Sequence, residues 1–258
     1  MSKQKVWRKA DRHQQILTEL GIRPAIRASE IAERLNVHVQ TIRRDLDELH
    51  ELGKINRTYG GAFPATMGFE ASVAERDLLL VEERGRIAEH AAAMIEPGDV
   101  VMVDVGATTA HFARHLAARG CEARIITNSW NFATIAGASP NLRLILCPGE
   151  YSHSQGGVSG PETTEFLSNF HADKFVFSAG GIADGGVYEV DPDFAWVKRA
   201  MISNSRQRIL LCDHQKLGRS AMTRVCGFDV VDDLVTDGSG DGSLPDEVRH
   251  AGVKVHVV

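Results

Sequence analysis

Residues able to hold an anion follow an apolar stretch in the middle of the sequence. Residues 100–103 are Val-Val-Met-Val, and the loop Asp104-Val105-Gly106-Ala107-Thr108-Thr109 comes directly after them. Because glycine lets a backbone approach a ligand, and because the first turn of a helix presents unpaired N–H groups, this loop favours a phosphate or a carboxylate. The threonine hydroxyls add further donors. The alternative is that Thr108 or Thr109 simply caps the helix that follows.

Polar or glycine-rich residues also end three further apolar segments. They are Thr127-Asn128-Ser129, Ser178-Ala179-Gly180-Gly181, and Asp213, with Lys216 three residues further on. Four such ends on one sheet favour a shared pocket over four separate caps. In that pocket Asp213 would accept hydrogen bonds from sugar hydroxyls, and Lys216 would neutralise a phosphate. For Lys216 the alternative is a solvated loop lysine.

A second set of candidate residues lies near the N-terminus, in residues 37–53. The sequence VHVQTIRRDLDELHELG predicts an amphipathic helix whose apolar face is formed by Ile42, Leu46 and Leu49. Gln40, Arg43 and Arg44 fall on the opposite face, close to the start of the helix. Arginine pairs bidentately with guanine and glutamine with adenine, so this end of the helix suits the major groove of DNA. The alternative is an ordinary helix with a charged solvent face.

The segments on either side of this helix favour the DNA-binding reading. Residues 12–21 and 29–35 predict two shorter helices, and Asn36 suits a left-handed turn after the second. Residues 54–63, KINRTYGGAF, predict a β-hairpin in which Lys54, Arg57 and Tyr59 can reach phosphate or the minor groove. Three helices followed by a basic hairpin predict a winged helix-turn-helix.

The elements that position the strand-end residues follow from alternating segments after about residue 85. Predicted strands cover residues 100–105, 123–127, 142–147, 174–181, 208–213, 232–237 and 253–258, and predicted helices cover residues 85–95, 108–120, 130–138, 161–170 and 194–205. This alternation predicts an α/β fold, a mostly parallel sheet with helices on both faces. Ligands of such sheets bind beyond the carboxyl ends of the strands.

Charge is distributed unevenly along the chain. Residues 1–66 hold 12 Lys and Arg against 8 Asp and Glu, a net +4, and the other residues hold 17 against 26, a net −9. A basic head on an acidic body predicts a nucleic-acid-binding domain, although a basic terminus can also be simply solvated. We expect a DNA-binding domain in residues 1–66, a linker in residues 67–84, and an effector-sensing and oligomerisation domain in residues 85–258.

Composition bounds the class of protein. The 258 residues are 43% hydrophobic and 24% charged, which predicts a globular protein with a substantial core. No apolar run reaches about 18 residues, and the first residues lack the apolar segment of a secretory signal. The four cysteines show no C-x-x-C pairing, and Cys147 and Cys212 lie within apolar runs. We therefore expect a cytoplasmic protein with reduced thiols, no membrane span, no metal and no cofactor.

Residues 29–63 resemble the DNA-binding signature of DeoR/GlpR-type repressors, through the T-I-R-R-D-L core at 41–46 and the glycine pair Gly60-Gly61. Residues 85–237 resemble the effector domain of the same family. The supporting motifs are D-V-G-A-T-T at 104–109, I-T-N-S at 126–129, the turn at Gly149, V-S-G-P at 158–161, A-D-K at 172–174, V-K-R-A-M at 197–201, and Asp213-x-x-Lys216. The resemblance implies a body similar in fold to ribose-5-phosphate isomerase, with phosphorylated sugars or polyols as ligands.

Some residues depart from the family pattern. His38 stands where the family usually has a serine before the recognition helix, and Ala107 where it usually has a hydroxyl residue. Phe194 and Trp196 occupy positions often held by acidic residues. These departures imply a changed helix cap or phosphate contact at His38. In the body they imply a ligand that has a different shape or depends less on a phosphate.

Two sets of site residues result. The DNA-contacting set is His38, Gln40, Thr41, Arg43, Arg44, Lys54, Arg57 and Tyr59. The effector-binding set is Asp104, Gly106, Ala107, Thr108, Thr109, Thr127, Asn128, Gly149, Gly180, Gly181, Asp213 and Lys216.

These observations predict a transcriptional repressor of a carbohydrate or polyol catabolic operon, with no catalytic residue. Its partners would be double-stranded operator DNA and a small phosphorylated sugar or polyol that releases the protein from that DNA. A homodimer or homotetramer would place two winged helices on operator half-sites. One alternative is a sugar-phosphate isomerase with an appended DNA-binding domain, in which Asp104, Asp213 and Lys216 would do acid–base work. Another is a structural DNA-binding module whose body only oligomerises.

Overall fold

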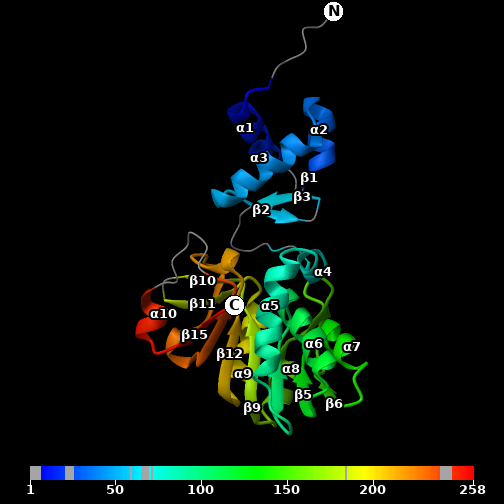
Figure 1. The fold of residues 1–258 in the computed structure, drawn as a ribbon, viewed down its shortest axis with the longest axis vertical. Helices are drawn as coiled ribbons and strands as arrows, with labels where there is room; N and C mark the ends of the chain where they lie inside the picture. Colours follow the sequence, from blue (N-terminus) through cyan, green and yellow to red (C-terminus); the bar gives the residue numbers. More distant parts are fainter. Residues whose placement is uncertain are drawn as a thin grey trace, which may run out of the picture. The chain divides into compact units, whose positions relative to one another are not determined.

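The chain divides into two units, Met1–Ala71 and Ser72–Val258. The computed structural model describes residues 7–20, 26–58, 60–64, 70, 72–183, 185–238 and 246–258. Each unit has a hydrophobic core of its own, so the two are described separately (Figure 1).

The described part of unit 1 has three helices and a small antiparallel sheet. Its elements are α1 (Lys9–Leu20), β1 (Ile26–Arg27), α2 (Ala28–Leu35), α3 (Val39–Glu51), β2 (Ile55–Thr58) and β3 (Gly61–Pro64). The predicted apolar face of α3 is buried, because Ile42, Leu46 and Leu49 are at most 1% exposed and share a core with Ile16 and Ile31. The predicted winged helix-turn-helix is confirmed.

Two residues define the turn between α2 and α3. Asn36 follows α2 with a φ of 51°, the left-handed conformation that the sequence predicts there. His38 precedes α3, and its Nδ1 accepts a hydrogen bond from the backbone N–H of Gln40 at 3.2 Å. The imidazole therefore provides the helix cap that the family's serine would provide.

The hairpin of unit 1 is closed by a third strand. The sheet order is β1-β3-β2, and Gly61 pairs with both Thr58 of β2 and Arg27 of β1. A Cβ atom on Gly61 would lie 1.8 Å from the carbonyl oxygen of Ile26. A glycine is therefore required for β1 to approach the wing.

Unit 2 is built on a sheet of seven described strands in the order β15-β14-β12-β9-β4-β5-β6, and every neighbouring pair is parallel. The strands are β4 (Val100–Val103), β5 (Ala123–Thr127), β6 (Leu142–Leu146), β9 (Ala172–Ser178), β12 (Ser205–Leu211), β14 (Asp233–Thr236) and β15 (Lys254–Val257). The order extends from β4 to β6 on one side and from β9 to β15 on the other. The direction of winding therefore reverses between β4 and β9.

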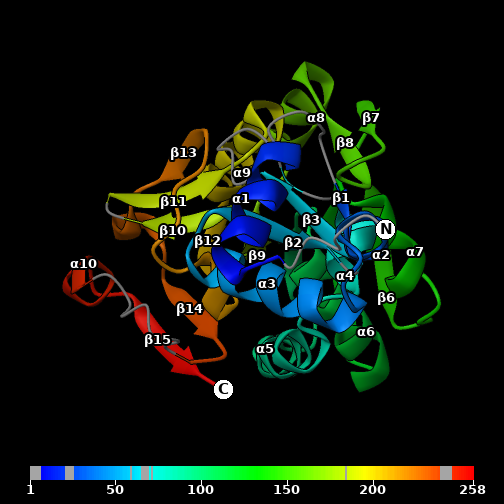
Figure 2. The ribbon, with the colours of Figure 1, turned by 90° about the horizontal axis from the view of Figure 1, so that it is seen from above.

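Helices cover both faces of this sheet (Figure 2). They are α4 (Val73–Asp77), α5 (Val81–Ala93), α6 (Ala107–Arg119), α7 (Trp130–Ala136), α8 (Pro161–Leu167), α9 (Pro192–Ser203), α10 (Asp246–His250) and the 3-10 helices η1 (His214–Lys216) and η2 (Phe228–Val230). The pleat of β4 shows the two layers, because Val101 and Val103 pack with α5 and α6 while Met102 packs with α8 and α9. The predicted mostly parallel α/β sheet domain is confirmed.

Short strands add two small sheets. They are β7 (Glu150–Ser152), β8 (Gly157–Ser159), β10 (Gly181–Ala183), β11 (Gly186–Glu189) and β13 (Thr223–Cys226). The first sheet is the hairpin β7-β8, and the second has the order β10-β11-β13. Both extend loops that leave the carboxyl ends of the main strands.

Residues 72–80, which the sequence places in the linker, fold against unit 2. Ser72 and Glu75 form a capping box at the start of α4, and the backbone N–H of Val73 donates to the carbonyl of Ser154 at 2.8 Å. The next helix, α5, begins at Val81, four residues before its predicted start.

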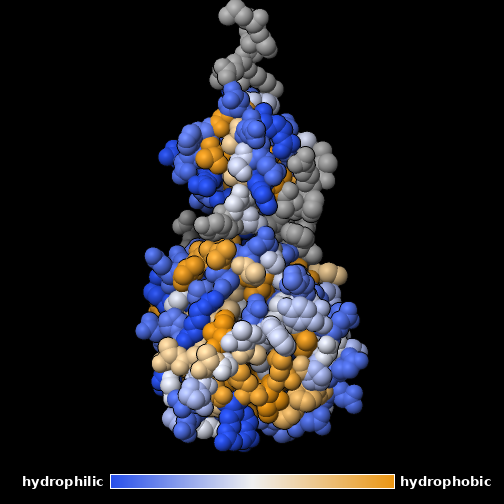
Figure 3. Space-filling view, turned by 90° about the vertical axis from the view of Figure 1, so that its right-hand side faces the viewer, coloured by the Kyte–Doolittle hydropathy of each residue, from blue (hydrophilic) through white to orange (hydrophobic). Residues whose placement is uncertain are grey.

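One edge of the main sheet carries apolar surface. On the face that Figure 3 shows, apolar side chains gather on the side of unit 2 that holds β6 and α7. Exposed side chains of these elements include Trp130 and Leu146, at 54% and 38%. Within the described residues, no helix has the length and apolar character needed to cross a membrane.

Candidate functional site

The predicted ligand residues follow four strands that are neighbours in the sheet. β5, β4, β9 and β12 lie side by side and parallel. Residues 127–129, 104–109, 178–181 and 213–216 are at or just beyond their carboxyl ends, so these residues share one edge, which we call the ligand edge. The winding reverses between β4 and β9, and open α/β sheets bind ligands at this point.

The glycine loop after β4 leads directly into α6. Gly106 precedes the helix, and Ala107, Thr108 and Thr109 form its buried first turn. The Thr109 hydroxyl donates to the carbonyls of Asp104 and Gly106, at 3.0 and 3.1 Å, and so holds the loop. The start of a 13-residue helix therefore points its N–H groups and positive dipole end toward the ligand edge.

Gly106 is required by packing rather than by its backbone angles. Its φ of 160° and ψ of 158° are extended, and other residues adopt them. A Cβ atom there would lie 2.2 Å from Oγ of Ser178, which ends β9. The loop after β4 and the end of β9 therefore meet at the reversal point without room for another side chain.

Asp104 belongs to a buried charge cluster. Its Oδ2 pairs with the ammonium of Lys198, which also contacts Glu189 at 2.9 Å, and its Oδ1 accepts from the backbone N–H of Ser178 at 3.2 Å. Burial raises the pKa of Asp104 to about 6, although Lys198 opposes the shift. Burial alone would lower the pKa of Lys198, but the two carboxylates raise it above its usual value. Both oxygens of Asp104 thus have internal partners.

Asn128 brings an unpaired acceptor to the ligand edge. Its side chain is buried, and its Nδ2 donates to the carbonyl of Val158 at 2.8 Å, but its Oδ1 has no hydrogen-bond partner among the residues that the structure describes. The hydroxyl of the preceding Thr127 is already bonded to the carbonyl of Val103 at 2.7 Å. A buried acceptor without a partner costs about 1–3 kcal/mol, so a ligand that donates to Asn128 would remove this cost.

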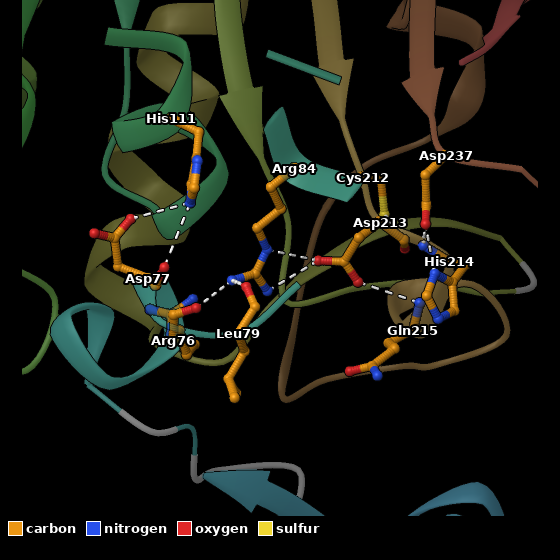
Figure 4. Close-up of polar contacts among 10 residues, drawn as sticks. All are labelled: Arg76, Asp77, Leu79, Arg84, His111, Cys212, Asp213, His214, Gln215 and Asp237. Atoms are coloured by element: carbon orange, nitrogen blue, oxygen red, sulfur yellow. Dashed lines mark hydrogen bonds and ion pairs between the residues drawn. The ribbon is translucent and has the colours of Figure 1, made fainter. Parts of the chain in front are cut away.

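Asp213 is the second buried carboxylate of the ligand edge (Figure 4). Its Oδ2 accepts from Nε and Nη2 of Arg84, at 3.1 and 3.0 Å, and its Oδ1 accepts from the backbone N–H of Gln215 at 3.2 Å. Asp213 therefore orders the turn of η1, which carries Lys216, and any ligand hydroxyl would have to share these oxygens.

A histidine in the same turn has a carboxylate partner. Asp237, at the end of β14, accepts from the backbone N–H of His214 at 2.7 Å and lies 2.6 Å from its Nδ1 (Figure 4). The contact fixes the orientation of the imidazole ring, two residues before Lys216 in the chain. His214 keeps 33% of its side chain exposed, so a ligand can reach it.

The remaining predicted glycines are packing positions at this edge. A Cβ on Gly149 would lie 2.1 Å from Oγ1 of Thr163, and one on Gly181 would lie 2.1 Å from the carbonyl oxygen of Arg219. Gly180 donates its backbone N–H to the carbonyl of Tyr188 at 2.8 Å. These residues let the surrounding loops approach the strands closely.

The predicted DNA-contacting residues of α3 lie on one surface of unit 1. Gln40, Arg43 and Arg44 are exposed, and Thr41 is half-buried. Arg43 contacts Gln40 at 3.5 Å, near the limit of a hydrogen bond. The surface that carries these side chains is opposite the core face, as the helical spacing predicts.

The predicted DNA-contacting residues of the hairpin differ in their exposure and in their contacts. Lys54 is exposed, but Arg57 contacts Asp47 of α3 at 2.9 Å and donates to the carbonyl of Gly61 at 2.7 Å. Arg57 thus ties the wing to α3. Tyr59 lies outside the described residues.

Sequence reasoning did not name Arg84 and Lys198, the cations of the two buried clusters. A signal was present for Lys198, which lies in the predicted helix 194–205, whereas Arg84 lies one residue before the predicted helix 85–95. Arg84 lies three and four positions before Ile87 and Ala88 on the apolar face of α5, and Lys198 lies three before Met201 on that of α9. A cation on a predicted core face indicates a buried partner of opposite charge.

A hollow of about 470 Å³ lies at the opposite edge of the sheet, near the amino ends of β4, β5 and β6. Its lining includes Glu122, Arg124 and Arg143 and none of the predicted ligand residues. Across the described residues, no three His, Cys, Asp or Glu side chains gather where they could hold a metal ion.

Comparison with known proteins gives matches over both units. A family model described as the DeoR C terminal sensor domain matches residues 80–238, and one described as the DeoR-like helix-turn-helix domain matches residues 12–66. The glycerol-3-phosphate regulon repressor of Escherichia coli K12 is 34% identical over 231 residues, 89% of this chain and 91% of that protein. The transcriptional repressor GlcR of Bacillus subtilis 168 is 32% identical over 233 residues, 90% of each chain.

Solved structures give weaker matches. A D-ribose-5-phosphate isomerase in complex with phospho-erythronic acid is 17% identical, with a TM-score of 0.41 over 53% of this chain and 54% of that one. The full-length sorbitol operon regulator SorC from Klebsiella pneumoniae is 13% identical, with a TM-score of 0.36 over 80% and 90%.

Proposed function

The chain belongs to the DeoR family of transcriptional repressors, and we propose that it represses a carbohydrate or polyol catabolic operon until a phosphorylated sugar-like effector releases it from its operator. Its matched relatives are named transcriptional repressors, so it is a regulator rather than an enzyme. Because its partner is operator DNA, we place its action in the cytoplasm.

The arrangement of two groups at the ligand edge is the observation that supports a phosphorylated ligand. The start of α6 offers N–H groups to an anion. The buried Oδ1 of Asn128, which follows the neighbouring strand, lacks a donor within the described part of the chain. A phosphate would suit the first position, and a hydroxyl would donate to the second. One small molecule that carries both groups is a phosphorylated sugar or polyol, with Lys216 as a further cation for the phosphate.

The DNA half of the proposal rests on the exposed face of α3. Gln40, Arg43 and Arg44 would read base edges in the major groove, while His38, Thr41, Lys54, Arg57 and Tyr59 would contact the backbone or the minor groove. Arg57 would have to leave Asp47 to do so.

A homodimer or homotetramer would present two such helices to an operator. The apolar surface at β6 and α7 supports self-association, because β6 is the last described strand on that side of the main sheet and its outer edge has no partner among the described residues.

Calorimetric titration of the full chain tests the ligand class. The probes are glycerol 3-phosphate, ribose 5-phosphate, glucose 6-phosphate and their unphosphorylated counterparts. We expect a phosphorylated probe to bind, and Asn128→Ala to weaken it about tenfold or more, since a buried hydrogen bond is lost. The matched control is Asn141→Ala, at the opposite edge, which should bind like the wild type. Equal binding of the unphosphorylated counterpart would contradict the proposal.

A further inference from the structure

We propose that Arg84 joins the ligand edge to α4, the first element of the chain after the DNA-binding unit, and so transmits ligand binding toward that unit. The inference rests on the proposed function and adds the residue through which the ligand site acts.

One guanidinium contacts both segments. Nε and Nη2 of Arg84 bind Asp213 at the end of β12, and Nη1 donates to the carbonyls of Leu79, at 3.0 Å, and Arg76 (Figure 4). The side chain is 5% exposed, so water does not compete for these contacts. Because a guanidinium is planar and rigid, its two edges cannot turn independently. A displacement of Asp213 therefore displaces the donors that hold residues 76–79.

The turn between α4 and α5 is strained. Leu80 has a φ of 52° and a ψ of 41°, a left-handed conformation that a residue with a Cβ atom disfavours. Such strain persists only where the surroundings hold it. The two carbonyls that Arg84 binds, those of Arg76 and Leu79, precede this leucine, so loss of the contacts lets the turn relax.

A second contact joins α4 to α6, the helix that follows the glycine loop. Asp77 pairs with Arg114 of α6 at 3.0 and 2.5 Å. His111 of the same helix lies 3.4 Å from Asp77 (Figure 4). The first residues of α6 form the proposed anion site. α4 is thus held by two parts of the ligand edge: by α6 directly, and by Asp213 through Arg84.

Ligand binding has a direct way to alter this arrangement. Asp213 also accepts the N–H of Gln215 and so sets the position of the turn that carries Lys216. A phosphate that draws Lys216 toward α6 moves this turn and, with it, Asp213. Arg84 then either moves with Asp213 or keeps its hydrogen bonds to the carbonyls of Arg76 and Leu79. These two alternatives give two discrete states of α4.

Hydrogen exchange of the ligand-free full chain tests the tether. Arg84→Lys keeps the charge beside Asp213 but lacks the planar fork. We expect amides of residues 72–80 to exchange about tenfold faster, since hydrogen bonds to a charged group are lost. The control is Arg86→Lys on the same helix, where the side chain is exposed, and it should exchange like the wild type. Unchanged exchange in Arg84→Lys would overturn the proposal.

Operator affinity with and without the phosphorylated probe that binds best tests the coupling. In Arg84→Lys we expect the ratio of the two affinities to fall toward one, while the Kd of the probe stays within about threefold of wild type. An undiminished ratio would overturn the coupling. A wild-type chain that no probe releases contradicts the proposed function instead, and the exchange result then decides the tether alone. If Arg84→Lys does not fold, Arg84→Gln replaces it with the same expected outcomes.

Discussion

At the scale of single residues, the buried cluster of Asp104, Glu189 and Lys198 holds two carboxylates and one ammonium group. Its net charge is −1 when all three groups are ionised. Burial of the Asp104 carboxyl raises its pKa to about 6. The charge of Glu189 adds to this rise, and Lys198 opposes it. The cluster joins the ends of β4 and β11 to α9, so its protonation state bears directly on the ligand edge.

Asp104→Asn should change the pH dependence of stability. Folded Asp104 holds a proton up to about pH 6, whereas the unfolded chain releases it near 3.8. The stabilisation is therefore complete below 3.8 and is lost as the pH rises through 6. We expect the wild type to gain about 1 kcal/mol over the variant between pH 7.5 and pH 5. Urea unfolding of both proteins at the two pH values measures this gain, and parallel profiles would refute the assignment.

Gly106→Ala should destabilise unit 2 by about 1–3 kcal/mol, because its Cβ would meet Oγ of Ser178 at 2.2 Å. Adding Ser178→Ala should recover part of the loss. Gly85→Ala is the matched control, since nothing lies within 4 Å of its Cβ position in α5 and alanine favours a helix. The control should gain about 0.5–1 kcal/mol. Chemical denaturation decides, and a Gly106→Ala protein as stable as the wild type would contradict the close contact.

At the scale of elements, the cap of α3 is a local device with a measurable effect. His38→Ala should destabilise the start of the helix by about 0.5–2 kcal/mol, because the N–H of Gln40 loses its acceptor. His38→Ser should restore most of the stability that His38→Ala loses. Hydrogen exchange at residues 40–42 reports the change, and equal protection in His38→Ala and the wild type would show that the imidazole is not the cap.

The exposed face of α3 gives a second prediction. Arg43→Ala or Arg44→Ala should cost about 1–3 kcal/mol of operator affinity if that side chain reads a base. Arg86→Ala, an exposed arginine of unit 2, serves as the control and should leave affinity unchanged. Fluorescence anisotropy with labelled operator measures both. Wild-type affinity in the two α3 variants would exclude α3 as the recognition helix.

Local patterns predicted the long elements well. β5 has the predicted bounds 123–127, and the buried face of α3 is the predicted one, because both depend on periodicity within a few residues. The short strands β7, β8, β10, β11 and β13 were missed, because segments of three or four residues are too short to show an alternating pattern. β13 also depends on pairing with β11, which lies far from it along the chain.

The candidate site likewise has one part that local sequence patterns predict and one part that they do not. The strand-end positions followed from the apolar segments, but the order of strands that brings them together depends on crossovers that no local pattern specifies. The contact of Arg84 with Asp213 spans 129 residues, so spacing along the chain could not reveal it.

At the scale of the whole molecule, the chain joins a basic DNA-binding unit to an acidic sensor unit. Net charges of +4 on residues 1–66 and −9 on the remainder direct the first toward DNA and the second away from it. In such an arrangement the ligand acts on DNA affinity only through a free-energy coupling between two separate sites.

The most direct test is the affinity of the full chain for its operator, selected from genomic fragments, with and without the phosphorylated compound that binds it best. The account predicts that saturating compound weakens operator binding by about 5- to 150-fold, and that operator weakens binding of the compound by the same factor. A compound that occupies the sensor unit and leaves operator affinity unchanged would contradict it.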